Sequence, residues 1–441
     1  MNKKHYKKYP AYKDSGIEWI GEIPEHWSIK RLKHITQCLD GKRIPLNADQ
    51  RGKIQGEIPY WGANGILDYL NDYLFDEDLV LLGEDGAPFF DRNKSVSFFV
   101  TGKIWVNNHA HILRSIKGTE SKFLCNALNC VDYRQYINGS TRDKLTQGEM
   151  NDIPIQFPPF IEQKAIANFL DCKTSLIDTL IDKKKRQIEL LNEQRQAVIN
   201  QAVTKGLDPD VEMKDSSVKW LGKIPKHWDV QRLRYIFTMN TGLSITKEDL
   251  QENGIPCINY GDIHIRYGFD LDLSRDILKY VDEKYLDSKQ SALAIKNDFV
   301  FCDTSEDIEG SGNCVYISKV NSSQLFAGSH TIIAKPIIEV NSRYLAYLFM
   351  SPSWRTQIRS KVYGIKVYSI TQKILKDAIA ILPPLLEQQN IVDYLDEKTK
   401  EIDIGVKKAE KQIQLLQEYR TALISEAVTG KIDVRGKYEF S

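Results

Sequence analysis

Cysteine is scarce in this chain, with seven residues in 441, and the seven are scattered and odd in number. None of them forms a C-x-x-C pair, so the sequence has neither the spacing of a zinc site nor an even-numbered disulfide framework. We therefore expect reduced thiols in a cytoplasmic protein. Long hydrophobic runs are missing as well: no stretch approaches the roughly 20 apolar residues that a membrane-spanning helix needs. The basic N-terminus is not followed by the apolar segment of a signal peptide.

An excess of charge of one sign is also missing. The chain has 60 Lys and Arg residues against 59 Asp and Glu residues, which gives a formal net charge of +1. Bulk electrostatics therefore gives no argument for binding nucleic acid, and any contact with DNA has to come from the local placement of basic groups.

Signatures of methyl transfer are incomplete. The stretch FPPF at 157–160 resembles the active-site turn N-P-P-[FYW] of adenine-N6 methyltransferases, but Phe157 stands where that motif has asparagine, and the second copy, at 382–385, reads LPPL. A Phe or Leu side chain cannot hold the amine of adenine, and no glycine-rich loop follows a strand to bind S-adenosylmethionine. The structural explanation covers both copies, since Pro-Pro suits extended chain followed by the first turn of a helix.

Nuclease and metal sites are not predicted either. The carboxylates of LLGEDG (81–86) and CDTSEDIEG (302–310) follow expected strands, but neither stretch has the D-x-n-E-x-K pattern of restriction nucleases. No Walker A or H-E-x-x-H sequence occurs. His109 and His111 alternate on one expected strand and should face the same side, yet no further ligand identifies a metal site. The sequence therefore predicts no catalytic, metal or cofactor site in this chain.

The chain has an internal duplication, which is the dominant feature of its sequence. Residues 14–35 and 215–236 are identical at 11 of 22 positions, and the stretch 145–178 returns as 370–403, at an offset of 225. Between these repeats the two halves differ, apart from faint echoes such as NNHAHIL against GSHTIIA. Each half is therefore a shared opening, a divergent middle and a shared ending.

Each shared ending has the apolar period of one long helix. Apolar residues occupy the positions of Ile166, Ile177 and Ile181 in both copies and continue at helical spacing to Ala202, leaving a narrow stripe on a charged surface. A helix on the order of 60 Å long, at ~1.5 Å per residue, needs a partner along its length, and its own copy offers a matching stripe. Because the first helix leads to the second half and the second helix returns, we expect an antiparallel pair with the two domains at opposite ends. Gly405 predicts a bend or a close approach in the second helix.

The divergent middles contain strand-like stretches separated by turn signals, so we expect mixed α/β domains. The predicted fold class is α+β, with two pseudo-symmetric α/β domains separated by an antiparallel two-helix coiled coil. The predicted modules are a first domain at 1–160, a first long helix at 161–208, a second domain at 209–385, and a second long helix with a C-terminal tail at 386–441.

Basic, polar and aromatic side chains in the turns of both middles are the candidates for contacting DNA. Arg, Lys, Asn and Gln can pair with base edges in the major groove, and Lys can pair with phosphates. The candidates in the first half are Lys42, Arg43, Tyr60, Trp61, Asn64, Asn107, His109, His111, Arg142 and Lys144. Those in the second half are Lys247, Tyr260, Thr304, Ser305, His330, Lys366, Tyr368 and Lys373.

The duplicated phrases resemble those of one family. The pattern W-[IL]-G-x-I-P-x-H-W begins at Trp19 and Trp220, P-P-x-x-E-Q occurs in both shared endings, and L-x-E-[QY]-R ends at Arg195 and Arg420. In this order and in two copies, the phrases are similar to those of the specificity subunits of type I restriction–modification enzymes. The resemblance covers nearly the whole chain.

This resemblance implies a non-catalytic subunit that binds double-stranded DNA. Each divergent middle would be a target recognition domain for one half of a split DNA sequence, and the paired helices would fix the distance between the half-sites. Two modification (methyltransferase) subunits would dock on the chain, with Arg195 and Arg420 among the partner-binding residues, and restriction subunits would join them. S-adenosylmethionine, ATP and Mg would belong to those partners, and this chain would hold no cofactor.

A second interpretation stays open from the residues alone. The even charge is compatible with a protein-only scaffold, in which two α/β modules on a coiled-coil rod join other subunits without touching nucleic acid. The duplicated family phrases favour the specificity subunit.

Overall fold

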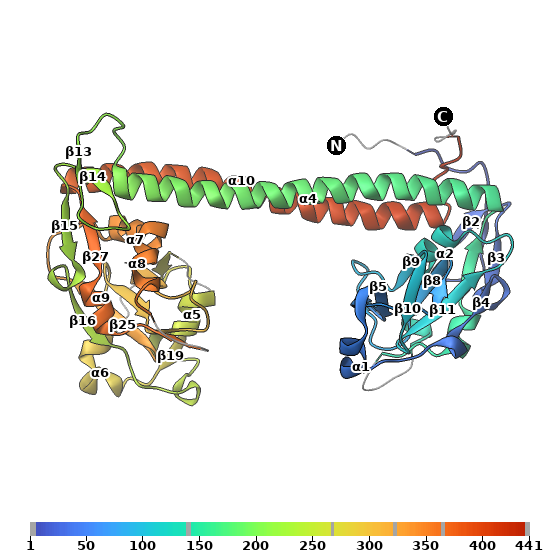
Figure 1. The fold of residues 1–441 in the computed structure, drawn as a ribbon, viewed down its shortest axis with the longest axis horizontal. Coiled ribbons are helices and arrows are strands. Elements are labelled where there is room, and N and C mark those ends of the chain that lie inside the picture. The colour runs from blue at the N-terminus through green and yellow to red at the C-terminus, as the bar shows by residue number, and fades with distance from the viewer. Residues whose placement is uncertain (1–5, 138–142, 266–268, 321–323, 363–366, 437–441) are drawn as a thin grey trace. The chain divides into compact units, whose positions relative to one another are not determined.

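The computed structural model describes residues 6–137, 143–265, 269–320, 324–362 and 367–436. The chain divides into two compact units, here called unit 1 (Met1–Arg186 with Ala409–Ser441) and unit 2 (Gln187–Lys408). Each unit combines a β-rich domain with half of each of two long helices, α4 (Phe160–Lys205) and α10 (Leu385–Val428) (Figure 1). None of the described helices is long and apolar enough to cross a membrane.

In unit 1 the shared opening pairs with the shared ending. The antiparallel partner of β3 (Ser28–Arg31) is β12 (Pro154–Phe157), the strand that runs into α4. The remaining strands of the unit are β1 (Tyr12–Asp14), β2 (Glu22–Pro24), β4 (Thr36–Cys38), β5 (Gln55–Gly62), β6 (Gly65–Leu70), β7 (Phe75–Asp76), β8 (Leu79–Gly83), β9 (Ser97–Val100), β10 (Lys103–Val106) and β11 (Ala110–Ser115). Its short helices are α1 (Ala48–Lys53), α2 (Ser121–Leu128) and α3 (Gln147–Asp152).

Unit 2 repeats this arrangement, with β15 (Asp229–Arg232) paired to β27 (Ile379–Leu382) immediately before α10. Its other strands are β13 (Met213–Asp215), β14 (Lys223–Pro225), β16 (Phe237–Thr241), β17 (Ile255–Ile258), β18 (Asp270–Asp272), β19 (Lys279–Val281), β20 (Leu293–Ala294), β21 (Phe299–Cys302), β22 (Thr304–Ser305), β23 (Cys314–Lys319), β24 (Leu325–Ala327), β25 (Thr331–Pro336) and β26 (Tyr368–Ser369). Its short helices are α5 (Tyr260–Ile265), α6 (Tyr285–Ser288), α7 (Ser342–Met350), α8 (Pro352–Arg359) and α9 (Gln372–Asp377).

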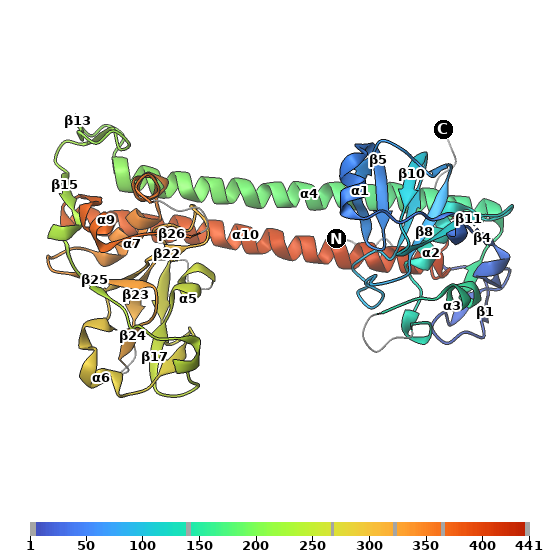
Figure 2. The same ribbon diagram turned by 60° about the horizontal axis from the view of Figure 1, so that its bottom comes forward.

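The divergent middles share one topology although their sequences differ. One sheet has the order β4-β11-β8-β9 in unit 1, and its counterpart β16-β25-β21-β23 in unit 2 has one further strand, β18. Figure 2 shows β4, β11 and β8 of the unit 1 sheet side by side. A second sheet has the order β6-β5-β10-β7 in unit 1 and β19-β17-β24-β20 in unit 2. Its central pair is parallel in both units, β10 with β5 and β24 with β17. The duplication therefore includes the middles as well as the repeated phrases.

The two long helices pack together, as the apolar stripe predicts. In unit 1, Ile177 and Ile181 of α4 join Leu416 and Leu423 of α10 in one buried cluster. The start of α4 thus packs beside the end of α10, and in unit 2 the end of α4 shares a cluster with the start of α10. The pair is therefore antiparallel. A Cβ added to Gly405 would lie 3.3 Å from a methyl carbon of Leu191, so this glycine permits the predicted close approach.

The predicted module boundaries assign each long helix to a module of its own. By contacts, the compact units each include half of α4 and half of α10. Each half of a long helix belongs by contacts to the unit of its neighbouring domain. These contacts do not test the predicted boundaries at the ends of the long helices, which stay a prediction.

Candidate nucleic-acid interface

Several of the predicted residues of unit 1 gather around Glu84, directly after β8. The Arg43 guanidinium lies 2.5 Å from Glu84 Oε2, and Lys144 Nζ lies 3.5 Å from Glu84 Oε1. The buried His111 places Nδ1 2.6 Å from Asp40 Oδ2 and Nε2 2.9 Å from the carbonyl oxygen of Leu145. Burial acts to raise the pKa of Asp40, but hydrogen bonds from His111 and from a backbone amide outweigh it and lower that pKa.

The cluster is balanced without a metal ion. Ligand atoms of Asp40, Glu84 and His111 lie within 4.8 Å of one another. Arg43 already pairs with both carboxylates and also donates to the carbonyl oxygen of Ala110. Together, Arg43 and Lys144 supply the two positive charges that the carboxylates of Asp40 and Glu84 need, so the cluster serves as a framework for the loops around it.

His109 and His111 do not lie on one strand, contrary to the sequence expectation. Strand β11 begins at Ala110, so His109 lies in the preceding turn, half-exposed, with Nδ1 3.4 Å from Asp85 Oδ2. His111 is buried inside the sheet. The alternation rule applies only within a strand, and the turn breaks it.

The other candidates of unit 1 divide into surface and framework residues. Lys42 and Asn64 are exposed. Tyr60 is buried with its hydroxyl bonded to the backbone of Leu46, and the buried Asn107 accepts a bond from the amide of His109. Trp61 is half-buried against Phe98. Arg142 lies outside the described residues.

In unit 2 the candidates gather around Asp303, directly after β21. The ring of the exposed His330 lies 3.3 Å from Asp303 Oδ1 and packs edge-on against Tyr260. Thr304 is partly exposed and Ser305 is buried, and both pair with the strand β26 that contains Tyr368. Lys247, in a short 3-10 helix, and Lys373, in α9, are exposed, and Lys366 lies outside the described residues.

The two clusters occupy equivalent places in the repeated sheet. The amide of Glu84 donates to the carbonyl of His109 and the amide of Asp303 donates to that of His330, over 2.8 and 3.0 Å. Each unit therefore presents a histidine beside a carboxylate at the same end of the sheet, where β8 or β21 ends. We call this end the sheet edge. The faint echo between NNHAHIL and GSHTIIA was the only sequence signal of this equivalence.

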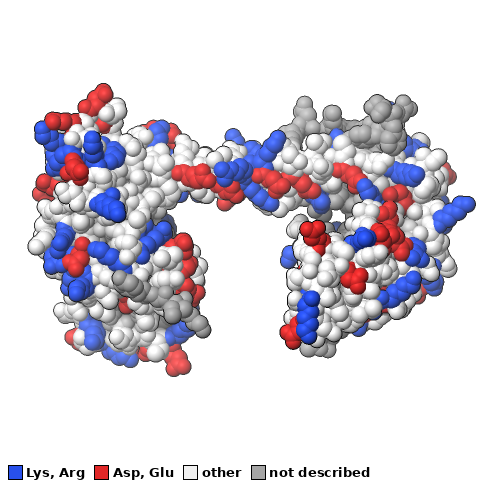
Figure 3. Space-filling view, viewed as in Figure 1, with Lys and Arg blue, Asp and Glu red and all other residues white. Residues whose placement is uncertain are grey.

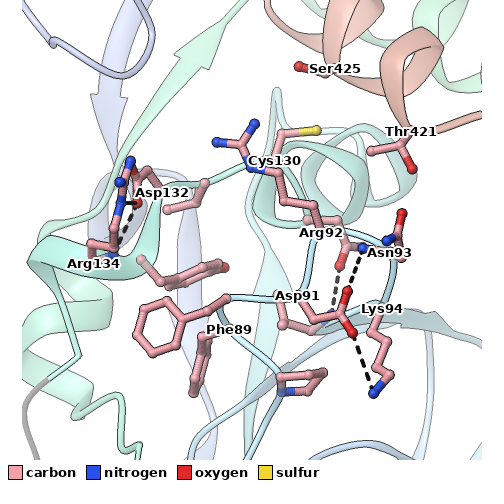
Figure 4. Close-up of a pocket in the computed structure, with 16 residues that line it drawn as sticks. Phe89, Asp91, Arg92, Asn93, Lys94, Cys130, Asp132, Arg134, Thr421 and Ser425 are labelled. Carbon is pink, nitrogen blue, oxygen red and sulfur yellow. Dashed lines mark hydrogen bonds and ion pairs between the residues drawn. The ribbon is translucent and has the colours of Figure 1, made fainter. Parts of the chain in front are cut away.

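Charged side chains of both signs occur in each unit. Figure 3 shows basic and acidic side chains interspersed on the visible face of each unit. A pocket of about 560 Å³ in unit 1 follows the same rule: its lining pairs Asp91 with Lys94 and Asp132 with Arg134 (Figure 4). None of the predicted DNA-contacting residues lines this pocket.

The phrase P-P-x-x-E-Q, whose individual residues the sequence argument did not select, seats each domain on its long helix. In unit 1 the buried Glu162 accepts bonds from Tyr9 Oη (2.5 Å), Trp27 Nε1 (2.9 Å) and His26 Nε2 (2.9 Å). Burial and the bond to Glu162 raise the pKa of Tyr9, so its hydroxyl stays a donor. In unit 2 the equivalent Glu387 pairs with His227 at 2.7 Å.

The glutamine of the phrase makes the same contacts in both units. Gln163 donates to the carbonyl of Pro158 (2.9 Å) and accepts from the amide of Glu120 (2.8 Å), which caps α2. Gln388 donates to the carbonyl of Pro383 (2.8 Å) and accepts from the amide of Asn341 (2.8 Å), which caps α7. The repeated glutamine thus fixes a helix of the divergent middle to the shared ending.

Replacing either glutamine by leucine should destabilise its own unit by a similar amount. Gln163→Leu and Gln388→Leu each remove the partner of a buried carbonyl and of a partly buried amide, which costs about 2 kcal/mol. Hydrogen exchange of α2 and α7 measures this loss in each unit separately. Asn168→Leu, at an exposed site on α4, is the control, and an effect in one unit alone would contradict the equivalence of the two seats.

Arg195 and Arg420, predicted to bind partners, have partners within the chain. Arg195 Nη1 lies 2.9 Å from Asp403 Oδ1 in unit 2, and Arg420 Nε lies 3.0 Å from Asp178 Oδ1 in unit 1. Both ion pairs join α4 to α10, and they are related by the offset of 225. They contribute to the pairing of the two helices in each unit.

Comparison with known proteins gives one consistent family. A family profile described as "Type I restriction modification DNA specificity domain" matches residues 24–190 and 225–415. The MjaVIII specificity subunit of Methanocaldococcus jannaschii is 22% identical over 94% of this chain and 94% of its own length. The EcoKI specificity subunit of Escherichia coli is 22% identical over 95% and 92%. A putative type I specificity subunit of Haemophilus influenzae is 33% identical over 162 residues, which cover 37% of this chain and 38% of the relative.

A solved structure also has this fold. A chain from the structure titled "Structural basis underlying complex assembly and conformational transition of the type I R-M system" aligns over 94% of this chain and 99% of its own length. The TM-score is 0.66 at 15% sequence identity, so the likeness is one of fold.

Proposed function

Because this chain belongs to the type I restriction–modification DNA specificity family, whose members are the non-catalytic specificity subunits of the enzyme, we propose that it reads a bipartite DNA target with two unlike domains. The observation that carries the proposal is the pair of sheets that is repeated in the two units. The same two sheets stand on equivalent seats in each unit, while the side chains at the equivalent sheet edge differ.

The chemistry of the two edges supports different half-sites. Unit 1 offers Lys144, Asn64 and His109, which suit phosphates and the edges of bases. Unit 2 offers His330 beside Tyr260, a histidine with an aromatic neighbour. Two readers with different side chains would recognise an asymmetric target.

The long helices would set the spacing between the half-sites. Each is continuous over 46 or 44 residues, and ion pairs and an apolar stripe hold the two together. DNA repeats its groove orientation about every 34 Å, so a stiff connection selects half-sites a fixed number of base pairs apart.

The proposed partners are two modification subunits and the restriction subunits of a type I complex. The duplicated frame supports two copies of one partner, since each half offers the same seat. S-adenosylmethionine, ATP and Mg would be bound by those partners.

Replacing Lys144 by alanine tests the reader surface of unit 1. Lys144 is half-exposed and lies against Glu84 without a buried hydrogen-bond network of its own. We expect Lys144→Ala, in complex with the modification subunit, to bind its target about tenfold more weakly at low salt and to lower the salt slope by about 1. Lys94→Ala, also exposed in unit 1, is the matched control.

The whole proposal is tested by mapping the adenines that the assembled complex methylates in random-sequence DNA. A motif of two half-sites with an unread spacer supports it. A complex that forms without retaining DNA would favour the protein-only scaffold.

A further inference from the structure

The first turns of α4 and α10 expose apolar side chains at the same positions of the repeat. Ile161 is 84% exposed and Leu386 is 76% exposed, and each follows an exposed residue, Phe160 or Leu385. The proline before each pair is also exposed. We call each run of three, 159–161 in unit 1 and 384–386 in unit 2, an apolar corner.

These corners stand on rigid and equivalent supports. The residues that follow Ile161, Glu162 and Gln163, are buried and fully bonded within unit 1. Gln388 holds the backbone of the second corner in the same way, over nearly equal distances. The two corners therefore present apolar side chains of different shape, Phe-Ile and Leu-Leu, at the same positions of an equivalently held backbone.

Apart from Leu190 and Leu415, each 50% exposed, the other large exposed apolar residues of the shared endings do not recur as exposed pairs. Leu176 is 54% exposed, but Glu401 stands at its place in the second copy, and Ile404 has Thr179 as its counterpart. The charges beside the corners differ as well, since Lys164 in unit 1 corresponds to Gln389 in unit 2. What the two corners share is their apolar surface.

We propose that each apolar corner docks one copy of the same partner, the modification subunit, which covers Ile161 in unit 1 and Leu386 in unit 2 with an apolar pocket. The inference rests on the proposed function and adds the surface on which the modification subunit would bind. Apolar side chains that are exposed at the same repeat position in both copies suit a partner that binds the chain twice, whereas the two DNA half-sites would bind two unlike domains. A few apolar anchors of this kind carry most of the energy of an interface.

Substitution by aspartate tests the proposal because it places a charge where the partner would be apolar. Aspartate in the first turn of a helix is compatible with the helix dipole, so the helix itself should keep its stability. We expect Ile161→Asp and Leu386→Asp each to reduce the modification subunits bound per chain from two to one, by native mass spectrometry without DNA. The double variant should bind none, with affinity at each site lowered at least about 100-fold by the buried charge.

The matched control is Leu176→Glu, which gives the first copy the residue that the second copy already has; it should bind two subunits. Two copies bound by the double variant with unchanged affinity would overturn the proposal, as would a single variant that loses both copies. If the unaltered chain binds no modification subunit, the proposed function fails instead, so the two failures are distinct.

Discussion

Glu162→Ala should lower the free energy of opening of unit 1 by at least about 3 kcal/mol, while Glu387→Ala should lower that of unit 2 by less than about 1 kcal/mol. The two residues occupy the same place in the repeat, but their surroundings differ. Glu162 is 5% exposed and accepts bonds from Tyr9, Trp27 and His26. Its removal leaves buried donors without acceptors. Glu387 is 29% exposed, and its bond to the half-exposed His227 is worth little in water.

The difference arises from the segments that meet at each seat. In unit 1 the segment around Tyr9 lies against the C-terminal segment, with the amide of Asp433 bonded to the carbonyl of Lys7 and Arg435 over the ring of Tyr9. The close approach of a glycine to the seat tryptophan is common to both units, Gly430 to Trp27 and Gly206 to Trp228, so the segment around Tyr9 is what sets unit 1 apart. Unit 1 therefore buries its glutamate more completely.

Hydrogen exchange of the peptides covering 22–35 and 160–170, with 223–236 and 385–395 as their counterparts, measures each effect in its own unit. Glu162→Gln, which keeps one acceptor, should fall between the two alanine variants. Equal losses in both units would contradict the assignment of the buried network to unit 1.

The frame could be predicted from the sequence because its signals are local and doubled. A stripe with a period of 3.6 residues marks a helix wherever it occurs, and two copies of the stripe identify the partner. The antiparallel pairing and the close approach at Gly405 followed from this. The common topology of the middles did not, since the parallel pairing of β10 with β5 joins residues some 45 positions apart through contacts that no local period records.

The candidate site was predicted only in part, for a related reason. Residue type shows that a side chain can pair with a base. It does not show whether that side chain already forms an ion pair or hydrogen bond within the protein. Arg43 and His111 are engaged by Glu84 and Asp40, partners 41 and 71 positions away in the chain. Lys42 and Asn64 have the same polar character and lie on the surface. The prediction that these residues contact DNA therefore depends on surroundings that the fold alone supplies.

Asp298→Asn should stabilise unit 2 at neutral pH by about 2 kcal/mol and remove most of its pH dependence between pH 4 and 7. Asp298 stands before β21, is 3% exposed, and accepts one bond from the amide of Ile295. Burial raises its pKa to about 6, against the opposing effects of that bond and of Lys335. A carboxyl group with a raised native pKa favours the native state when protonated. Its contribution is therefore present below about pH 4 and is lost as the pH rises through 6.

Asparagine keeps the shape of Asp298 and an oxygen for the amide of Ile295, without the buried charge. The protection factor of β21, corrected for the intrinsic pH dependence of exchange, should fall between pH 4 and 7 in the unaltered chain and stay level in the variant. Asp78 precedes β8 in the same way but is exposed and bonded to Thr101, so Asp78→Asn should change neither unit. A variant whose β21 still loses protection as the pH rises would show that another group titrates. Because β21 leads directly to Asp303, which lies beside His330, we expect this charge to make the stability of that part of unit 2 depend on pH.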